Sequence, residues 1–290
     1  MPELPEVETL RRGLATVLPG RRILSVQVLD GKAVAGSPEI TGPCVTGHRI
    51  GQPDRRGKVL IVPLDGSGSL LVHPKMTGQL VVTVAGETVT AGGHPTPSML
   101  RPMPNPTTRV IFRLDRGTCL YYNDARRFGW IRLAGPEPWK TDPFLRRLGP
   151  EPLGGEFTVA ALRAALTRHA RAPVKAVLLD QTAVAGIGNI YADEILHHAR
   201  IHPARPAGRL GPTPTRRLHA AIRAVLSGAV ETGGTSFADY VNEFRGQAGY
   251  LDHAEVFRRE GQPCTVCGTP IVRTRIAGRP TRFCPRCQRR

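Results

Sequence analysis

Apolar residues recur at helical spacing at the start of the chain. Pro5 suits the first turn of a helix, where its missing N–H would have no partner in any case. The pattern therefore predicts an N-terminal helix preceded by a short solvated start. Its apolar positions are Leu4, Val7, Leu10, Leu14 and Val17.

Between residues 22 and 134 the hydrophobic period changes to two, which is typical of strands. Glycine-rich breaks separate the alternating segments, which lie at 23–29, 59–63, 70–73, 79–84, 110–114 and 120–123. A series of short strands of this kind predicts a β-sandwich.

Two proline-rich stretches interrupt the pattern. Residues 92–108 are predicted to form a long loop without regular structure, and residues 135–155 to link two domains. Beyond this linker the period is 3.6, which predicts a helical domain. Its apolar positions are Val159, Leu162, Leu166, 177–179, 195–196 and 218–226.

The length and composition of the chain agree with two soluble domains. A chain of 290 residues exceeds one average domain, and 40% hydrophobic residues suit a soluble globular protein. No apolar run is long enough for a membrane span, and the first ten residues lack the apolar core of a signal peptide. We therefore expect a protein of the cytoplasm or nucleoid, with no membrane partner.

The net charge of the chain indicates which kind of molecule it binds. A net charge of +17 points to a polyanion, most simply nucleic acid, with a membrane surface as the weaker alternative. The chain has 35 arginines and only five lysines, so each lysine is of interest, although most can be plain surface residues. The lysines are Lys32, Lys58, Lys75, Lys140 and Lys175.

Four cysteines near the end of the chain have zinc-ribbon spacing. Cys264 and Cys267 form one pair, and Cys284 and Cys287 form the second after sixteen intervening residues. Four thiolates leave no open position for water, so the zinc is expected to be structural. Disulfides are the alternative, which a cytosolic location disfavours. Between the pairs lie basic residues suited to phosphates: Arg273, Arg275, Arg279 and Arg282.

The other two cysteines, Cys44 and Cys119, stand alone in apolar surroundings and are predicted to be core thiols. In the helical half, the segment 184–189 contains Gly186 and Gly188 just before a predicted helix. Glycines let backbone N–H groups approach an anion at a helix N-terminus, so this segment is either a phosphate-binding turn or a plain interhelical turn.

The first residues carry candidate chemistry. Trimming of Met1 would leave Pro2 as a secondary amine, and an α-amino group has a pKa near 7.7–8.0, so that much of it is neutral and nucleophilic. Such an amine attacks an aldehyde-like carbon to form an iminium. Glu3 beside it can protonate the bond that opens. These residues alone leave the solvated helix start as the simpler interpretation.

Together these features resemble the bacterial formamidopyrimidine-DNA glycosylases, within the wider formamidopyrimidine/endonuclease VIII-type family. The matching stretches span both ends and most of the chain between them. They are Pro2–Glu8, Arg56–Lys58, Met76–Gly78, Asp124–Gly129, Gly186–Ala192, Gly246–Tyr250 and the cysteine block.

The resemblance implies an α+β fold with two domains. A helix and β-sandwich would form the catalytic domain over 1–134, followed by the linker 135–155. A helix-two-turn-helix DNA-binding domain would cover 156–252, and a four-cysteine zinc finger with a β-hairpin would cover 253–290. Zinc is the one cofactor implied, with no organic cofactor.

The resemblance also implies the catalytic groups. Pro2 would attack C1′ of the damaged nucleotide while Glu3 protonates the sugar ring oxygen, and elimination would then cut the strand. Lys58 matches a hairpin lysine that assists phosphate contact and proton transfer. Arg279 matches a zinc-finger arginine, which we interpret as a phosphate clamp because a guanidinium is a poor proton donor.

Other residues would contact DNA by the same resemblance. Met76, Arg126 and Phe128 match the set that fills the gap left by a flipped base. Arg171, Lys175 and Asn189 would hold backbone phosphates, whereas Arg127 can equally support the fold.

The chain departs from the family pattern in three places. Residues 73–76 read His-Pro-Lys-Met in place of the usual His-Leu-Gly-Met. Residues 107–109 read Thr-Thr-Arg where a His-x-His pair is common, which puts a DNA contact there in doubt. The proline-rich loop 92–108 is longer than usual.

The leading hypothesis is a monomeric base-excision-repair enzyme, a glycosylase and AP lyase acting on oxidised purines or abasic sites in double-stranded DNA. Leu4 favours purines, because endonuclease VIII-type enzymes for oxidised pyrimidines usually have glycine there. The alternatives are that pyrimidine enzyme, a catalytically inactive protein that binds damaged DNA, and a ribosome-associated zinc-ribbon protein, which leaves the Pro-Glu start unexplained.

Overall fold

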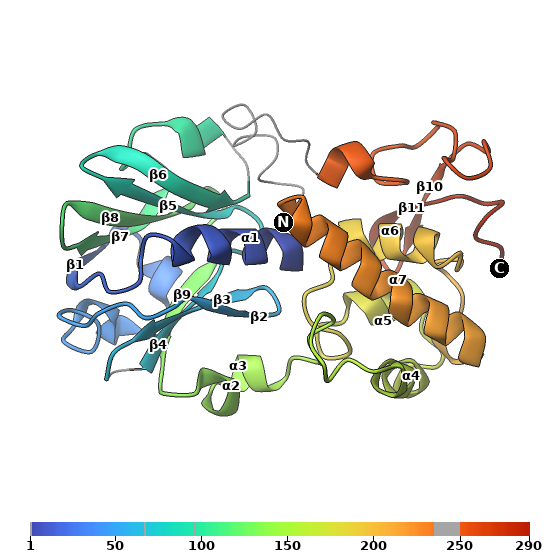
Figure 1. Cartoon of the computed structure of the whole chain (residues 1–290), viewed down its shortest axis with the longest axis horizontal. Coiled ribbons are helices and arrows are strands. Elements are labelled where there is room, and N and C mark those ends of the chain that lie inside the picture. Colours follow the sequence, from blue (N-terminus) through green and yellow to red (C-terminus); the bar gives the residue numbers. More distant parts are fainter. Residues whose placement is uncertain (1, 67, 95–96, 235–249) are drawn as a thin grey trace. The chain divides into compact units, whose positions relative to one another are not determined.

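The computed structural model describes residues 2–66, 68–94, 97–234 and 250–290 (Figure 1). These residues form two compact units. The first runs to Arg146 and includes Gly233 and Gly234, and the second comprises Arg147–Thr232 and the residues from Tyr250 onward. The division falls inside the predicted linker, and the cysteine-containing segment clusters with the helical residues. The α+β class predicted from the sequence is confirmed.

The predicted N-terminal helix is present as α1 (Leu4–Ala15). It ends just before Val17 because Thr16 is its C-cap. Its buried face is Leu4, Val7, Leu10 and Leu14. Gly13 lets the helix lie close to the neighbouring sheet, since a Cβ there would stand 2.7 Å from Thr90 Oγ1.

Two antiparallel sheets make up the rest of the first unit. The order in the five-stranded sheet is β1 (Ile23–Val28), β7 (Thr108–Leu114), β8 (Thr118–Asp124), β5 (Gly78–Val84) and β6 (Glu87–Gly93). The order in the four-stranded sheet is β2 (Asp54–Arg56), β3 (Val59–Leu64), β4 (Gly68–His73) and β9 (Trp130–Ala134). All six predicted strands are present, whereas β2, β6 and β9 were missed. β2 and β6 are edge strands with polar or small residues, so neither carries an alternating apolar signal.

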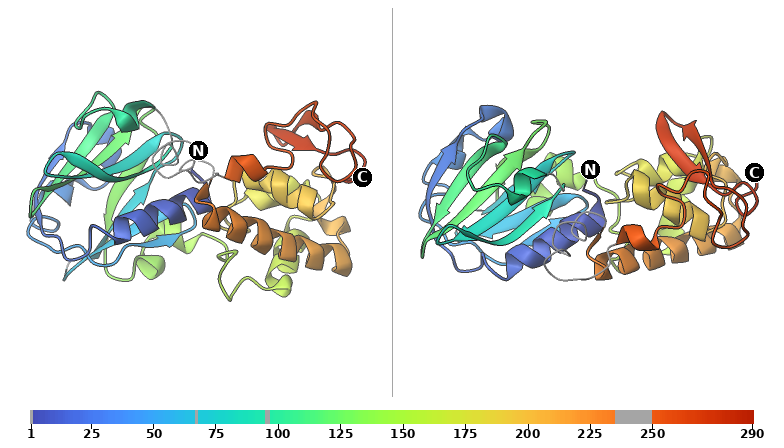
Figure 2. Two further views of the ribbon diagram at one scale, coloured as in Figure 1. Left: turned by 45° about the horizontal axis from the view of Figure 1, so that its top comes forward. Right: turned by 90° about the horizontal axis from the view of Figure 1, so that it is seen from above.

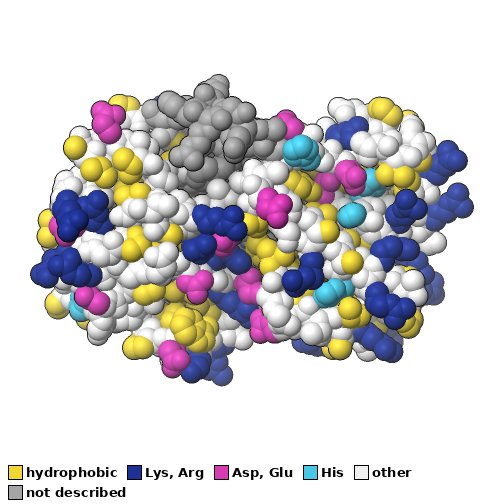
Figure 3. All heavy atoms as spheres, viewed as in Figure 1, with side chains coloured by type: hydrophobic (Ala, Val, Ile, Leu, Met, Phe, Trp, Pro, Cys, Tyr) yellow, Lys and Arg dark blue, Asp and Glu magenta, His cyan; other side chains and the backbone are white. Residues whose placement is uncertain are grey.

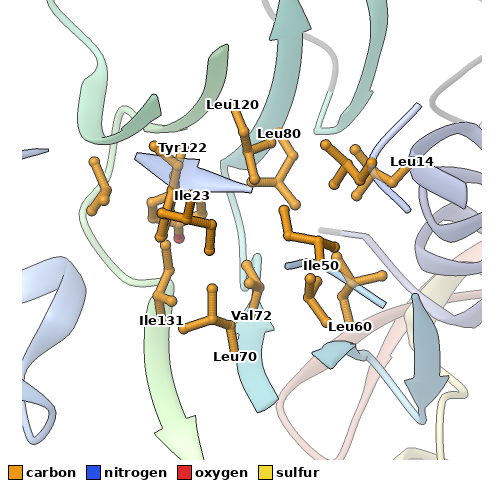
Figure 4. Packing of buried hydrophobic residues seen from close by; sticks show 14 of the residues in the cluster. Leu14, Ile23, Ile50, Leu60, Leu70, Val72, Leu80, Leu120, Tyr122 and Ile131 are labelled. Atoms are coloured by element: carbon orange, nitrogen blue, oxygen red, sulfur yellow. The ribbon is translucent and has the colours of Figure 1, made fainter. Parts of the chain in front are cut away.

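The core of the first unit lies between the two sheets (Figure 4). Leu70, Val72 and Ile131 from the smaller sheet face Leu80 and Leu120 from the larger one. Helix α1 packs against β6 of the five-stranded sheet and against β2 and β3 of the four-stranded sheet. It therefore covers one edge of the sandwich (Figure 2).

The proline-rich stretches contain more regular structure than expected. Within 135–155 lie the short helices α2 (Pro138–Thr141) and α3 (Pro143–Arg146), and each begins at a proline, which is favourable at a first helical position. In 92–108, residues 95–96 lie outside the described residues and η3 (Pro97–Leu100) is a 3-10 helix. Two more 3-10 helices, η1 (Gly31–Val34) and η2 (Pro38–Thr41), follow β1.

The second unit is helical, as its period of 3.6 predicts. Its helices are α4 (Val159–Arg168), α5 (Val174–Leu179), α6 (Asn189–His198), η4 (Ala207–Arg209), α7 (Pro212–Glu231) and η5 (Tyr250–His253). A hairpin of β10 (Val272–Ile276) and β11 (Arg279–Phe283) follows. The motif at 246–250 falls outside the described residues except for Tyr250, which is buried. Within the described residues, no helix has the length and apolar character that a membrane crossing requires.

Candidate functional site

The start of α1 buries two residues with candidate chemistry. Pro2 and Glu3 are both buried, and only 2% of the Glu3 surface is exposed. The backbone N–H of Glu3 donates to Glu6 Oε2 at 2.8 Å, so Glu6 caps the helix from its third position. Met1 lies outside the described residues. Pro2 and Glu3 are thus held at a capped helix end, which differs from the solvated start of the simpler interpretation.

Lys58 lies in the two-residue turn between β2 and β3 and is only 7% exposed. Gly57, the first residue of this turn, has a φ of 57°, which glycine adopts readily in hairpin turns. Arg55 connects the hairpin to α1: its Nε lies 3.3 Å from Glu8 Oε2, and its Nη1 donates to the Gly57 carbonyl at 2.8 Å. The alternative of an exposed surface lysine is therefore wrong.

Met76, Arg126 and Phe128 come together on the surface of the first unit, although Met76 belongs to the loop between β4 and β5 and the other two to the loop between β8 and β9. The Arg126 Cζ lies 4.9 Å from the centroid of the Phe128 ring, and its Nη1 lies 3.7 Å from Met76 Sδ. Phe128 is 52% exposed and Met76 37% exposed. A solvated group of large apolar side chains around one guanidinium is typical of a binding surface. We call these three residues the wedge cluster.

A buried carboxylate supports the wedge cluster. Asp124, which is 1% exposed, accepts hydrogen bonds from the Thr77 hydroxyl, from the Arg126 N–H at 3.2 Å and from the Gly129 N–H at 2.7 Å. The Arg126 N–H also donates to Thr77 Oγ1 at 2.9 Å. Asp124 therefore fixes both loops that carry the wedge cluster. Sequence reasoning assigned it no role, although an aspartate just before a turn is a recognisable signal.

The neighbouring arginines have structural partners. Arg127 Nε lies 2.5 Å from Asp30 Oδ2, with Arg109 Nε at 3.9 Å from the same oxygen. Arg109 Nε also donates to the Asp124 carbonyl at 2.8 Å. Thr108 is buried, and its hydroxyl donates to Asn123 Oδ1 at 2.8 Å. The segment that departs from His-x-His thus reinforces the sheet.

In the second unit, Lys175 differs from its expected role. Its side chain is fully buried, and Nζ lies 2.6 Å from Asp193 Oδ1, 3.0 Å from the Pro280 carbonyl and 2.8 Å from Thr281 Oγ1. An ammonium has three donors, so none is left for a DNA phosphate. Burial raises the pKa of Asp193 to about 6 despite the opposing effect of Lys175. Lys175 holds α5, α6 and the β10–β11 hairpin together.

Replacing Lys175 by methionine is expected to lower the free energy of unfolding of the second unit by about 3–5 kcal/mol, because Asp193 would keep a buried carboxylate without its cation. Urea unfolding measures this loss. The double variant Lys175→Met/Asp193→Leu is expected to regain most of it. If the double variant is as unstable as the single one, packing and not charge accounts for the effect.

Asn189 and the glycine turn before it also face inward. Asn189, the first residue of α6, donates through Nδ2 to the Pro280 carbonyl at 3.1 Å. The Gly186 N–H donates to Gln181 Oε1 at 2.9 Å, and Gln181 Nε2 donates to the Ile187 carbonyl at 2.8 Å. The turn is therefore closed by Gln181, so the Gly186 N–H is already used.

Arg279 follows the tight turn between β10 and β11, where Ala277 and Gly278 both have positive φ. Arg279 is exposed, and it forms no ion pair among the described residues. The next residue, Pro280, is held by Lys175 and Asn189, so the Arg279 backbone is fixed while its side chain is free to reach a phosphate. Arg171 is likewise exposed. Arginine side chains, dark blue in Figure 3, gather on the visible face of this unit, whose lysine Lys175 is buried.

The four predicted zinc ligands converge. Their Sγ atoms all lie within 4.8 Å of one another, which matches four thiolates about 2.3 Å from one tetrahedral zinc ion. The residues present therefore fit a structural zinc. His197 Nε2 lies 3.5 Å from Cys264 Sγ, and His197 Nδ1 lies 2.7 Å from Glu255 Oε2.

The two isolated cysteines fit their predicted role less well. Cys44 is exposed, so the prediction of a core thiol is wrong there. The apolar side chain that this segment buries is Val45, which follows Cys44. Cys119 is half-buried on β8 and packs against a small apolar cluster.

Family models match most of the chain. The formamidopyrimidine-DNA glycosylase N-terminal domain matches residues 1–131, the formamidopyrimidine-DNA glycosylase H2TH domain matches 148–241, and a zinc finger found in the same glycosylases and in isoleucyl-tRNA synthetase matches 261–290. A β-sandwich preceded by a helix and followed by an H2TH domain and a zinc finger is the domain arrangement of a class of DNA-repair glycosylases. The chain belongs to the formamidopyrimidine-DNA glycosylase family.

Individual relatives agree. The chain is 44% identical to the formamidopyrimidine-DNA glycosylase of Symbiobacterium thermophilum, over 99% of this chain and 89% of the relative. It is 41% identical to that of Heliobacterium modesticaldum over the full length of both. The crystal structure of the Thermus thermophilus enzyme is similar with a TM-score of 0.82 and 40% identity, covering 99% of this chain and 98% of the other.

A further solved structure, from Lactococcus lactis, is a complex with DNA that contains a formamidopyrimidine-dG. It is similar with a TM-score of 0.85 and 31% identity, covering 99% of this chain and 100% of the other.

Proposed function

We propose that this protein is a bifunctional DNA glycosylase and AP lyase that removes 8-oxoguanine and formamidopyrimidines from double-stranded DNA during base-excision repair. The observation that carries the proposal is the buried Pro2–Glu3 pair at the capped start of α1, in a chain of this family. The relatives named above are formamidopyrimidine-DNA glycosylases, which favours the purine enzyme over the pyrimidine enzyme and over an inactive DNA-binding protein.

The first chemical step is assigned to Pro2 and Glu3. The Pro2 nitrogen forms a bond to C1′ as the damaged base leaves and takes up a proton, and Glu3 protonates the ring oxygen so that the sugar opens to an iminium. Glu3 follows Pro2 directly in the chain and is only 2% exposed, so the proposed acid lies next to the proposed nucleophile.

Strand cleavage follows from the iminium. It acidifies the C2′ protons, so β-elimination expels the 3′ phosphate and δ-elimination then expels the 5′ phosphate. Lys58, on a hairpin fastened to α1, is assigned to phosphate contact and proton transfer. Arg279 is assigned to stabilising the charge of a leaving phosphate, since a guanidinium does not give up its proton.

DNA distortion is assigned to the wedge cluster. A base inside a duplex must be flipped out before Pro2 can reach its sugar, and the gap must be filled. Met76 and Phe128 would insert between neighbouring bases while Arg126 pairs with the orphaned base. Arg171 would contact a backbone phosphate, and Asn189 would act indirectly by holding the Pro280 carbonyl of the hairpin that carries Arg279. Zinc, when bound by the four cysteines, supplies no chemistry and holds the hairpin that carries Arg279. We infer that the protein works at the bacterial nucleoid.

The substrate assignment is tested with two duplexes, one with 8-oxoguanine opposite cytosine and one with thymine glycol opposite adenine. We expect faster base release and strand cleavage on the 8-oxoguanine duplex, measured as kcat/KM. A preference for thymine glycol would instead identify an oxidised-pyrimidine enzyme. Binding to both duplexes without cleavage would identify a damage-binding protein.

A further inference from the structure

Beside the wedge cluster, three rings and two cations form a second group that the mechanism does not use. His73 ends β4, opposite Trp130 on β9, and Phe144 comes from α3. The three ring centroids lie 5.6–5.8 Å apart in edge-to-face pairs. The side chains of Lys75 and Arg132 lie over two of these rings. We call these five residues the aromatic–cation cluster.

The two cations contact rings and not carboxylates. Lys75 Nζ lies 5.7 Å from the Phe144 centroid, and Arg132 Cζ lies 4.3 Å from the Trp130 centroid. In the described part of the chain, neither side chain forms an ion pair, and the buried Arg132 Nε has no hydrogen-bond partner. Burial and then the nearby Arg132 charge lower the pKa of Lys75. Like charges on a half-buried surface repel each other until an anion binds between them.

His73 adds no compensating charge. Burial, followed by the positive charges of Lys75, Lys58 and Arg132, holds the pKa of His73 well below its usual range, so its imidazole is neutral. The Lys75 backbone N–H donates to His73 Nδ1 at 3.1 Å. The charges that reach this ring are therefore all positive.

The backbone of Lys75 shows that this position is costly for a lysine. Its φ is 50°, in the left-handed region that suits glycine. The turn is closed by the Gly78 N–H, which donates to the Pro74 carbonyl at 2.9 Å. Strain of this kind commonly marks a residue with a function. The next residue in the turn is Met76, so Lys75 is adjacent in the chain to the wedge cluster.

We propose that Lys75 and Arg132 form a phosphate-binding subsite that holds a DNA backbone phosphate next to the position where Met76 enters the duplex. Each of the two cations lies over an aromatic ring, and the phosphate would supply the negative charge. The inference rests on the DNA-binding function proposed above and adds two contacts to it.

The test is the salt dependence of binding to a duplex with a tetrahydrofuran abasic analogue. Each lost phosphate contact lowers the slope of log K against log salt by about 0.9, which corresponds to about eightfold weaker binding at 0.1 M salt and almost none at 1 M. We expect this loss for Lys75→Gln and for Arg132→Gln, and expect Lys75→Arg to keep the slope of the unmodified protein. Lys140→Gln is the matched control, because Lys140 is exposed and paired with Glu137.

The variant Lys75→Gly distinguishes the effect of losing the charge from the effect of relieving the backbone strain. Glycine relieves the positive φ, so this variant is expected to melt no lower than the unmodified protein while it loses the same slope as Lys75→Gln. If Lys75→Gln and Lys75→Gly bind with the unmodified slope, the subsite does not exist. If the unmodified protein itself binds DNA without salt dependence, the DNA-binding function fails first, and the two failures are thereby distinguished.

The position of the phosphate is tested with duplexes in which one phosphate at a time is replaced by an uncharged methylphosphonate. One replacement near the abasic site is expected to weaken binding of the unmodified protein about eightfold at 0.1 M salt and to leave the double variant Lys75→Gln/Arg132→Gln unaffected. Equal effects of every replacement on both proteins would overturn the proposal.

Discussion

A protein with one extra residue fixed in front of Pro2 is expected to form no covalent adduct with damaged DNA. The extension turns the Pro2 nitrogen into an amide, which has no basic lone pair to attack C1′. Borohydride reduction traps the iminium of the trimmed protein on an 8-oxoguanine duplex, and gel electrophoresis detects the product. Pro2→Gly keeps an amine but loses the rigid ring that positions it, for which we expect at least a roughly 100-fold loss of adduct formation.

Glu3→Gln is the matched control for this experiment. It should lose about 10²–10⁴-fold in release of 8-oxoguanine, because the general acid is gone. The sugar of an abasic site already opens to its aldehyde without an acid from the protein, so Glu3→Gln should still form the adduct on a duplex that contains such a site, whereas the extended protein should not. Adduct formation by the extended protein on either duplex would place the nucleophile elsewhere, on a lysine amine.

Loss of the zinc ligand Cys284 is expected to have the largest effect on folding. Structural zinc contributes roughly 10–16 kcal/mol to the folding of small zinc-binding peptides at pH 7. Few other apolar residues pack in this region: Val256 and Ile271 join the cysteines in a small cluster. Cys284→Ala should therefore leave the β10–β11 hairpin unfolded and Arg279 unplaced. We expect one zinc ion per chain in the unmodified protein and none in the variant.

The consequences for DNA follow from the position of Arg279. Strand cleavage by δ-elimination should be lost in Cys284→Ala, while the adduct through Pro2 should still form wherever the DNA binds. Metal content by mass spectrometry and analysis of the cleavage products measure the two effects. Cys119→Ala is the control, because it removes a half-buried thiol outside the cluster. A Cys284→Ala protein with full zinc content would contradict the assigned ligand set.

Several features could be predicted from the sequence because they depend on local spacing. The apolar period placed α1, α4, α7 and six strands of the first unit, since burial of one face repeats with the geometry of each element. The Cys-x2-Cys pairs identified the metal site because two thiolates at this spacing can bind the same ion. β6 could not be predicted in this way, because its residues Glu87–Gly93 carry no alternating apolar pattern and pair with β5 only in the folded sheet.

The sequence by itself determined the family, the α+β fold, the zinc ligands and the candidate nucleophile, because each depends on residues that are close together in the chain. Only the tertiary structure decided which charges are available to DNA. Lys175 and Pro280 are 105 positions apart, and their contact removes Lys175 from the surface. Met76 contacts Arg126, and the Lys75 ammonium lies over the Phe144 ring, only after the strands have paired. The partner of a charged side chain is chosen by long-range packing, which no local pattern encodes.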